Sequence, residues 1–163
     1  MNNVELLAPA GSYESLVAAV NAGADAVYIG GKKFSARAYA DNPEEDILIK
    51  GIEYAHTFGV NVYMTVNTLL KESEIGELFD YIKTYYNAGV DAVIVQDLGV
   101  FEFIRKHFPK LSVHASTQMT ITGSYGAIFL KSQGASRIVP AREISLEEIR
   151  DIDKKCDIEI ECF

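Results

Sequence analysis

The sequence has little cysteine and no long apolar run, and each scarcity excludes a class of protein. Cys156 and Cys162 are its only two cysteines in 163 residues. They are too few for a disulfide framework, so a reducing, cytoplasmic location is expected. The longest apolar runs, such as residues 16–20 and 92–95, are far too short to cross a bilayer, so no membrane partner is expected. The first residues show no basic start and no leader-like apolar stretch.

Several catalytic motifs are also missing. The sequence contains no His-Glu-x-x-His, no Cys-x-x-Cys and no Gly-x-Ser-x-Gly. No zinc-protease or serine-hydrolase machinery can therefore be identified, and no metal site is predicted. His56 and His107 fall in expected helices and are interpreted as ordinary surface residues.

Positive charge is the scarcer sign. Lys and Arg number 15 against 23 Asp and Glu, which leaves a net charge of −8 and argues against a wholly basic nucleic-acid-binding surface. A local basic patch remains compatible with this total. The acidic residues cluster where helices are expected to begin, at residues 44–46, 72–74 and 147–148, where they favour the helix dipole.

A repeated strand and helix unit is the most informative feature that is present. Residues 21–27, 87–93 and 133–139 read alike, and residues 58–63 follow the same plan. Each has a Gly suited to a left-handed helix end, then a short polar residue, then an apolar run typical of a buried parallel strand. The expected strands are residues 4–8, 25–30, 60–66, 91–96, 111–115, 136–140 and 157–162, with a helix after each of the first six.

Helix start signals support the same alternation. Ser12 is expected to cap residues 13–22, and Ser145 with Glu148 has the spacing of a capping box. Asp41 or Asn42 is expected to cap a helix with Pro43 at its first position, and Ser73 to precede a helix over residues 74–88.

Strict alternation predicts an α/β fold of the (β/α) TIM-barrel type, incomplete, with about seven parallel strands and six helices. An open doubly wound sheet is the alternative, but no Gly-rich dinucleotide fingerprint follows the first strand. A closed barrel takes about 250 residues. We therefore expect residues 1–163 to form a single partial domain, cut within strand seven at Glu161-Cys162-Phe163. Its open strand edges would favour self-association.

In such a fold, function lies at the carboxyl ends of the strands. The longest loop there, residues 30–41, follows strand two and contains Lys32, Lys33 and Arg37 together with aromatic residues. Cations with aromatic rings suit contact with phosphate or a nucleobase. The alternative is a solvated loop that happens to be basic.

Polar residues end the later strands as well. His114 and Asp97 are catalytic candidates together with Glu161, although Asp97 is equally suited to cap the following helix. While strand geometry lasts, alternation places His114, Ser116 and Gln118 on one side of strand five. It likewise places Glu159 and Glu161 on one side of strand seven. The other substrate-binding candidates at these ends are Asn67, Gln96, Arg142 and Glu143.

Several of these segments together resemble the collagenase-like peptidase family U32. The resemblance rests on residues 5–11, 23–30, 34–37, 67–68, 91–97, 114–119 and 137–143, and on the final triplet Glu161-Cys162-Phe163. The run His-Ala-Ser-Thr-Gln-Met over residues 114–119 and the opening motif are the most specific of them.

The resemblance implies a TIM-like barrel and a historical label of peptidase or collagenase. It also implies kinship with bacterial proteins that hydroxylate tRNA bases, ribosomal RNA bases or ubiquinone precursors with an iron–sulfur cluster, and with prephenate required for the tRNA reaction. The expected partners are therefore RNA and a small anionic, prephenate-like cosubstrate. The family signature continues past a Glu-x-Phe triplet into a His-Gly and a cysteine cluster, so an iron–sulfur cluster is expected in the full-length parent and no cofactor in this chain. A peptidase and a non-catalytic binding scaffold remain the alternative functions.

Overall fold

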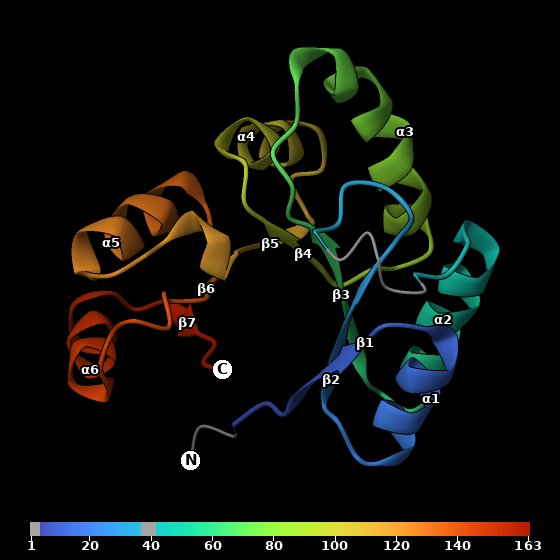
Figure 1. Cartoon of the computed structure of the whole chain (residues 1–163), viewed down its shortest axis with the longest axis horizontal. Coiled ribbons are helices and arrows are strands. Elements are labelled where there is room, and N and C mark those ends of the chain that lie inside the picture. The colour runs from blue at the N-terminus through green and yellow to red at the C-terminus, as the bar shows by residue number, and fades with distance from the viewer. Residues whose placement is uncertain (1–3, 37–41) are drawn as a thin grey trace. The chain divides into compact units, whose positions relative to one another are not determined.

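A computed structural model describes residues 4–36 and 42–163 (Figure 1). The described residues form seven strands and six α-helices, and the hydrogen-bonded strand order follows the chain from β1 to β7. This alternation of parallel strands and helices confirms the predicted (β/α) fold class. The elements are β1 (Leu7–Ala10), α1 (Tyr13–Asn21), β2 (Ala26–Gly30), α2 (Glu45–Thr57), β3 (Asn61–Val66), α3 (Glu72–Asn87), β4 (Ala92–Val95), α4 (Leu98–His107), β5 (Ser112–Ala115), the short 3-10 helix η1 (Thr117–Met119), α5 (Ser124–Gln133), β6 (Arg137–Ile138), α6 (Leu146–Lys155) and β7 (Glu159–Ile160).

The chain divides into two compact units, residues 1–93 and residues 94–163, which we call the N-terminal unit and the C-terminal unit. The boundary falls inside β4, and each unit is described by itself. The expectation of a single domain stays a prediction.

Apolar helix faces pack on buried strands in the N-terminal unit. All five residues of β2 are buried, and Leu16 of α1, Ile52 of α2 and Ile82 of α3 have essentially no exposed surface. Helices α1 and α2 lie side by side (Figure 1). Gly51 permits this approach, because a Cβ there would lie only 3.1 Å from the Leu16 Cδ1 atom.

The C-terminal unit has its own apolar core. Phe101 and Ile104 of α4, Leu130 of α5 and Ile152 of α6 are buried, as is Val113 of β5. Helices α5 and α6 are neighbours (Figure 1). The three- and four-residue spacing of apolar positions therefore produced buried helix stripes in both units.

The repeated glycines close helices in the left-handed conformation, as predicted. Gly23, Gly59, Gly89 and Gly134 have φ angles of 92°, 72°, 92° and 100°. A side chain would be strained at these angles, which explains why the repeat keeps glycine there.

The polar residue that follows in the repeat fastens the new strand to the preceding one in three copies, at Asp25, Asp91 and Ser136. Asp25 receives a hydrogen bond from the Leu6 N–H on its Oδ2 (2.8 Å), and Asp91 receives one from the Val62 N–H (2.7 Å). Ser136 instead donates from its hydroxyl to the Val113 carbonyl (3.2 Å). The repeat thus encodes strand pairing as well as helix termination.

Several predicted boundaries were wrong, among them the ends of β1 and β6 and both ends of β7. Strand β1 begins at Leu7 rather than residue 4, because the Leu6 carbonyl already accepts the N–H groups of Asp25 and Ala26 as the pair of strands begins. Helix α3 begins at Glu72 with Lys71 at the N-cap, where the Lys71 N–H donates to Glu74 Oε2 (2.7 Å).

Helix α2 also begins later than expected. Glu44, in extended conformation, is its N-cap, so Asn42 and Pro43 precede the cap instead of forming it. Asp41, the other expected cap, lies outside the described residues. The predicted Ser12 cap of α1 and the Ser145–Glu148 capping box of α6 are confirmed.

The acidic residues expected at helix starts do lie in first turns, in α2, α3 and α6. Across residues 4–36 and 42–163, no helix is both long enough and apolar enough to span a membrane.

Candidate functional site

Three neighbouring strands of the C-terminal unit bring together a histidine, an arginine and glutamates. In the parallel register, His114 of β5 pairs with Arg137 of β6, and Arg137 pairs with Glu159 of β7. Side chains at paired positions of a sheet point to the same face. His114, Arg137 and Glu159 therefore form one polar row across the three strands. We use the name strand-end row for these three residues and Glu161.

Arg137 is the centre of the row. Its Nε and Nη2 atoms donate to Glu159 Oε2 at 3.0 and 2.8 Å, and its Nη1 lies 3.7 Å from Glu161 Oε2. The Arg137 and Glu161 side chains are only 11% and 8% exposed, whereas that of Glu159 is 66% exposed. Glu159 and Glu161 thus approach the same guanidinium, in agreement with the alternation expected for strand seven.

His114 is a neutral partner in this row. Its side chain is buried, and burial, helped by the nearby positive charge of Arg137, lowers the pKa of its imidazole to about 3. The ring is therefore uncharged near pH 7. A base with so low a pKa removes protons poorly at that pH, so the environment suits His114 to orient a ligand by a hydrogen bond better than to act as a general base.

The alternation predicted beyond His114 ends early. Strand β5 stops at Ala115, and the hydroxyl of Ser116 accepts the Gln118 N–H (3.2 Å) to begin η1. Ser116 is buried, while Gln118 is exposed. The strand geometry on which the expected common face of His114, Ser116 and Gln118 depended therefore ends before Ser116, because a side-chain cap replaces it.

Asp97 lies at the N-terminus of α4 and caps it. Its Oδ1 accepts the N–H groups of Gly99 (2.7 Å) and Val100 (3.0 Å). The expected cap is confirmed, and the catalytic role of Asp97 stays a prediction. Gln96 precedes it, half-buried, at the end of β4.

Arg142 and Glu143 follow β6 and are exposed. The Arg142 guanidinium lies 5.2 Å from the centre of the Phe163 ring, within the range of a cation–π contact. This exposed cation remains available to an anionic ligand at the surface of the C-terminal unit.

The basic loop after β2 belongs to the N-terminal unit, and its lysines lie beside carboxylates. The Nζ atom of Lys32 is 3.3 Å from Glu44 Oε1, and that of Lys33 is 2.6 Å from Glu77 Oε2. The bond from Lys33 lowers the pKa of Glu77. Both lysines are more than half exposed, so a phosphate can compete for them. Arg37, the third expected cation, lies outside the described residues.

This loop is anchored by aromatic and polar contacts. The Tyr81 hydroxyl donates to the Lys33 carbonyl (3.0 Å). Phe34 has a φ of 61°, and its ring packs edge-on against the Tyr81 ring, with 5.1 Å between the ring centres. Burial raises the pKa of Tyr81, which keeps its hydroxyl protonated as a donor. Asn67 accepts the Ala36 N–H on its Oδ1 (3.0 Å), which gives this candidate a positioning role.

Arg137 is the residue that the sequence reasoning missed. It occupies the repeat position held by Ala26 and Ala92 in the other units, at the start of an otherwise apolar strand. A charge at a position that is small and apolar elsewhere in the repeat was the available signal. That Arg137 lies beside His114 and Glu159 follows only from the strand register.

The cysteines do not fit an iron–sulfur cluster. Cys156 is buried at the C-cap of α6, Cys162 is exposed, and neither forms a disulfide. Such a cluster usually takes four thiolates. Within the described part of the chain, no group of three or more His, Cys, Asp or Glu side chains is arranged to hold a metal ion.

Parallel strands in sequential order, alternating with helices, define a protein of the (β/α)-barrel class. The U32 peptidase Mk0906 shares this fold, with a TM-score of 0.77 and 16% identity over 99% of this chain and 70% of the other. The sequence model of peptidase family U32 matches residues 11–163, and the chain belongs to that family.

Two relatives with closer sequences are named for RNA modification. The chain is 42% identical to tRNA hydroxylation protein P1 of Bacillus subtilis over 98% of its own length and 38% of the relative. It is 41% identical to 23S rRNA 5-hydroxycytidine C2501 synthase of Escherichia coli over 99% of its own length and 24% of the relative. The chain therefore spans well under half of the length of each.

Proposed function

We propose that this chain is part of an RNA base hydroxylation protein, with tRNA as the favoured substrate. The identity of 42% to tRNA hydroxylation protein P1 over 98% of the chain carries the proposal. The similarity at 41% to an rRNA 5-hydroxycytidine synthase supports the broader class of RNA base hydroxylation.

The strand-end row would bind and orient ligands in this reaction. Neutral His114 offers a hydrogen bond, and Arg137 holds the buried Glu161 carboxylate. Proton transfer is assigned to Glu161 in preference to Asp97, because the Oδ1 of Asp97 is already used to cap α4. Exposed Arg142 would attract the carboxylate of a prephenate-like cosubstrate.

The loop lysines would contact the RNA backbone. Lys32 and Lys33 carry exposed ammonium groups. The loop that carries them is held by Asn67, through the Ala36 N–H, and by Tyr81, through the Lys33 carbonyl. A phosphate would replace Glu44 or Glu77 as the partner of a lysine, so this part of the binding should weaken with salt.

The iron–sulfur cluster expected of the parent would need thiolates other than Cys156 and Cys162. Two free cysteines support a reducing, cytoplasmic compartment. Strands β1 and β7 end the strand order, and their edges would mediate the proposed self-association, which sedimentation at several concentrations would measure.

A segment exchange tests the function. This chain would replace the aligned segment of B. subtilis tRNA hydroxylation protein P1, in cells that lack their own tRNA hydroxylation proteins. Nucleosides from their tRNA would then be measured by mass spectrometry. Return of the hydroxylated nucleoside is expected, with loss when Glu161→Gln is introduced.

A stably folded chimera that leaves tRNA unhydroxylated would overturn the proposal. The same purified chimera is assayed on gelatin, because relatives in this family carry the name peptidase or protease. Gelatin cleavage without RNA hydroxylation would favour the peptidase alternative, and inertness in both assays would favour a binding scaffold.

A further inference from the structure

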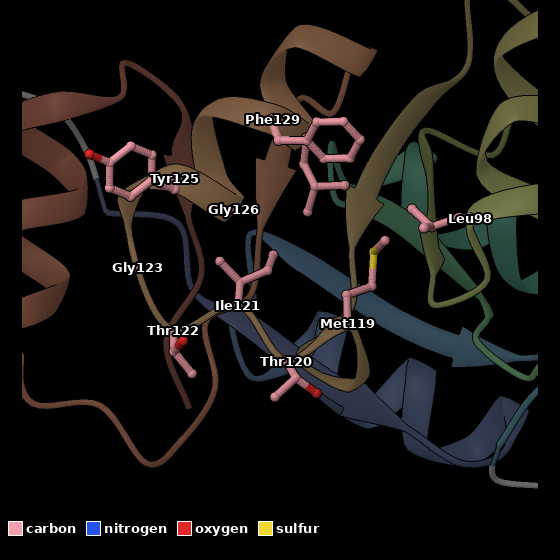
Figure 2. Close-up of a pocket in the computed structure, with 10 residues that line it drawn as sticks. Leu98, Met119, Thr120, Ile121, Thr122, Gly123, Tyr125, Gly126 and Phe129 are labelled. Atoms are coloured by element: carbon pink, nitrogen blue, oxygen red, sulfur yellow. The ribbon is translucent and has the colours of Figure 1, made fainter.

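The C-terminal unit contains a pocket that belongs to none of the sites described above. It has a volume of about 410 Å³ and is formed by residues 119–130 together with Leu98 of α4. Figure 2 shows Tyr125 and Phe129 projecting from α5, with Met119 and Leu98 on another side. The volume falls within the usual range of small-ligand sites, about 300–1,000 Å³.

The pocket is continuous with the carboxyl end of β5. The segment that forms most of it begins in η1, directly after His114, Ala115 and Ser116. Met119 is the last residue of η1 and also lines the pocket. In this fold class, the loops at the carboxyl ends of the strands form the functional face. The segment that lines the pocket therefore follows β5 directly along the chain, at the carboxyl end of that strand.

The lining is neutral and aromatic. None of the residues that line the pocket is Asp, Glu, Lys, Arg or His. Tyr125 is 92% exposed and Phe129 is 53% exposed, so both rings present surface to a ligand. Thr120 and Thr122 add two hydroxyl groups. Such a lining does not suit a phosphate or a carboxylate, but it suits a flat, uncharged heteroaromatic ring that stacks and forms a few hydrogen bonds.

Thr120 provides a further observation. Its φ of 56° places a β-branched residue in the left-handed region, where such residues are rare. Thr120 lines the pocket at the point where the chain leaves η1 and turns towards α5. Uncommon backbone conformations of this kind cluster at ligand-binding sites.

We infer that this pocket binds one unpaired nucleobase of the RNA substrate by stacking on Tyr125 and Phe129. The inference rests on the proposed function and adds a base-recognition site to it. The loop lysines contact phosphates and depend on salt, whereas the pocket contacts a base and carries no charge.

Crosslinking of this chain to RNA tests the inference. A single-stranded oligoribonucleotide with 4-thiouridine is irradiated with the chain, and the crosslinked peptide is identified by mass spectrometry. The crosslink is expected within residues 119–130. Crosslinks confined to other segments, or none at all, would overturn the inference.

Affinity measurements by fluorescence anisotropy use the same oligonucleotide. Tyr125→Ala is expected to raise Kd about 5- to 150-fold, which corresponds to a stacking energy of ~1–3 kcal/mol per base. Tyr125→Phe keeps the ring and is expected to stay within about twofold of the original Kd. Leu146→Ala is the matched control, because Leu146 is an exposed apolar side chain of the same unit outside the pocket.

Two further readouts separate stacking from charge. With an oligomer that lacks the bases, Tyr125→Ala is expected to leave Kd unchanged. The slope of log Kd against log salt should also remain unchanged in Tyr125→Ala, since no phosphate contact is lost. An unchanged Kd for base-containing RNA in Tyr125→Ala would refute the pocket, and an altered slope would show that the residue acts through the phosphates.

The two proposals fail in different ways. If the segment-exchange chimera hydroxylates tRNA but Tyr125→Ala binds RNA normally, the pocket inference alone is wrong. If base stacking at Tyr125 is found and the chimera leaves tRNA unmodified, the hydroxylation proposal is wrong while the base site stands.

Discussion

Removal of the Arg137 charge should expose how strongly the strand-end row is coupled. In Arg137→Met, the apolar stem of the side chain is kept while the guanidinium is lost. Glu161, which is 8% exposed, would then retain a buried negative charge beside no cation. Loss of one partner from a buried ion pair destabilises a protein by about 3–5 kcal/mol. Glu159 adds little to this figure, because it is 66% exposed and exposed pairs contribute ~0–1 kcal/mol.

Urea unfolding followed by circular dichroism would measure the loss. Because most of it comes from the stranded Glu161 charge, the double variant Arg137→Met with Glu161→Gln should recover at least half of it. Glu159→Gln is the matched single variant and should lose less than ~1 kcal/mol.

Chemical shifts of His114 give an independent readout. The positive charge of Arg137 contributes to the low pKa of this imidazole, so the pKa should rise in Arg137→Met while burial keeps it below the ordinary value of 6.5. The reasoning would be refuted if Arg137→Met unfolded at the original urea concentration, or if the losses of Arg137→Met and Glu161→Gln simply added in the double variant.

Three other predictions concern stability. The pKa of His114 is about 3 in the folded chain and 6.5 ordinarily, so the unfolded chain binds the proton first as the pH falls. His114 alone should therefore lower the free energy of unfolding by about 2 kcal/mol between pH 8 and pH 5. Urea titrations at both pH values should show a smaller drop in His114→Gln but not in exposed His107→Gln; equal drops would contradict the assignment. Asp97→Ala should lose ~0.5–2 kcal/mol in thermal unfolding and Asp97→Ser much less, because serine also caps helices; equal losses would argue against the cap. Gly134→Ala should lose more stability than Gly59→Ala, because its φ of 100° lies further than 72° from the left-handed region open to other residues; similar shifts in melting temperature would refute this.

The fold was readable because its determinants are local. A glycine at a helix end and an apolar run after it act within a few residues, so Gly23, Gly89 and Gly134 located three strands correctly. The start of β1 was misplaced because it depends on the partner: the Leu6 carbonyl is already bonded to residues 25 and 26.

The candidate site was only partly readable, for a related reason. His114 and Glu161 were selected as polar residues in apolar strands, and Arg137 joins them through strand register. Strand register is set by three segments together, so it cannot be predicted from the sequence of any one of them. Asp97 had two chemically reasonable roles, and only the positions of the Gly99 and Val100 N–H groups show that it caps α4.

The polar residues Asp25, Asp91 and Ser136 each bond to the strand before their own, and this affects the order in which the chain folds. Leu7 pairs with Ala26, and Arg137 with Glu159, so pairing partners are separated by only roughly 20 to 35 residues. Contacts over such short separations lose little chain entropy when they form, and they can form while later segments are still being synthesised. A ribosome that has released residues 1–66 has already supplied Asp25, both of its partner strands and the helices between them. Assembly by successive addition of strand and helix, from the first unit onwards, is thus built into the polar position of the repeat.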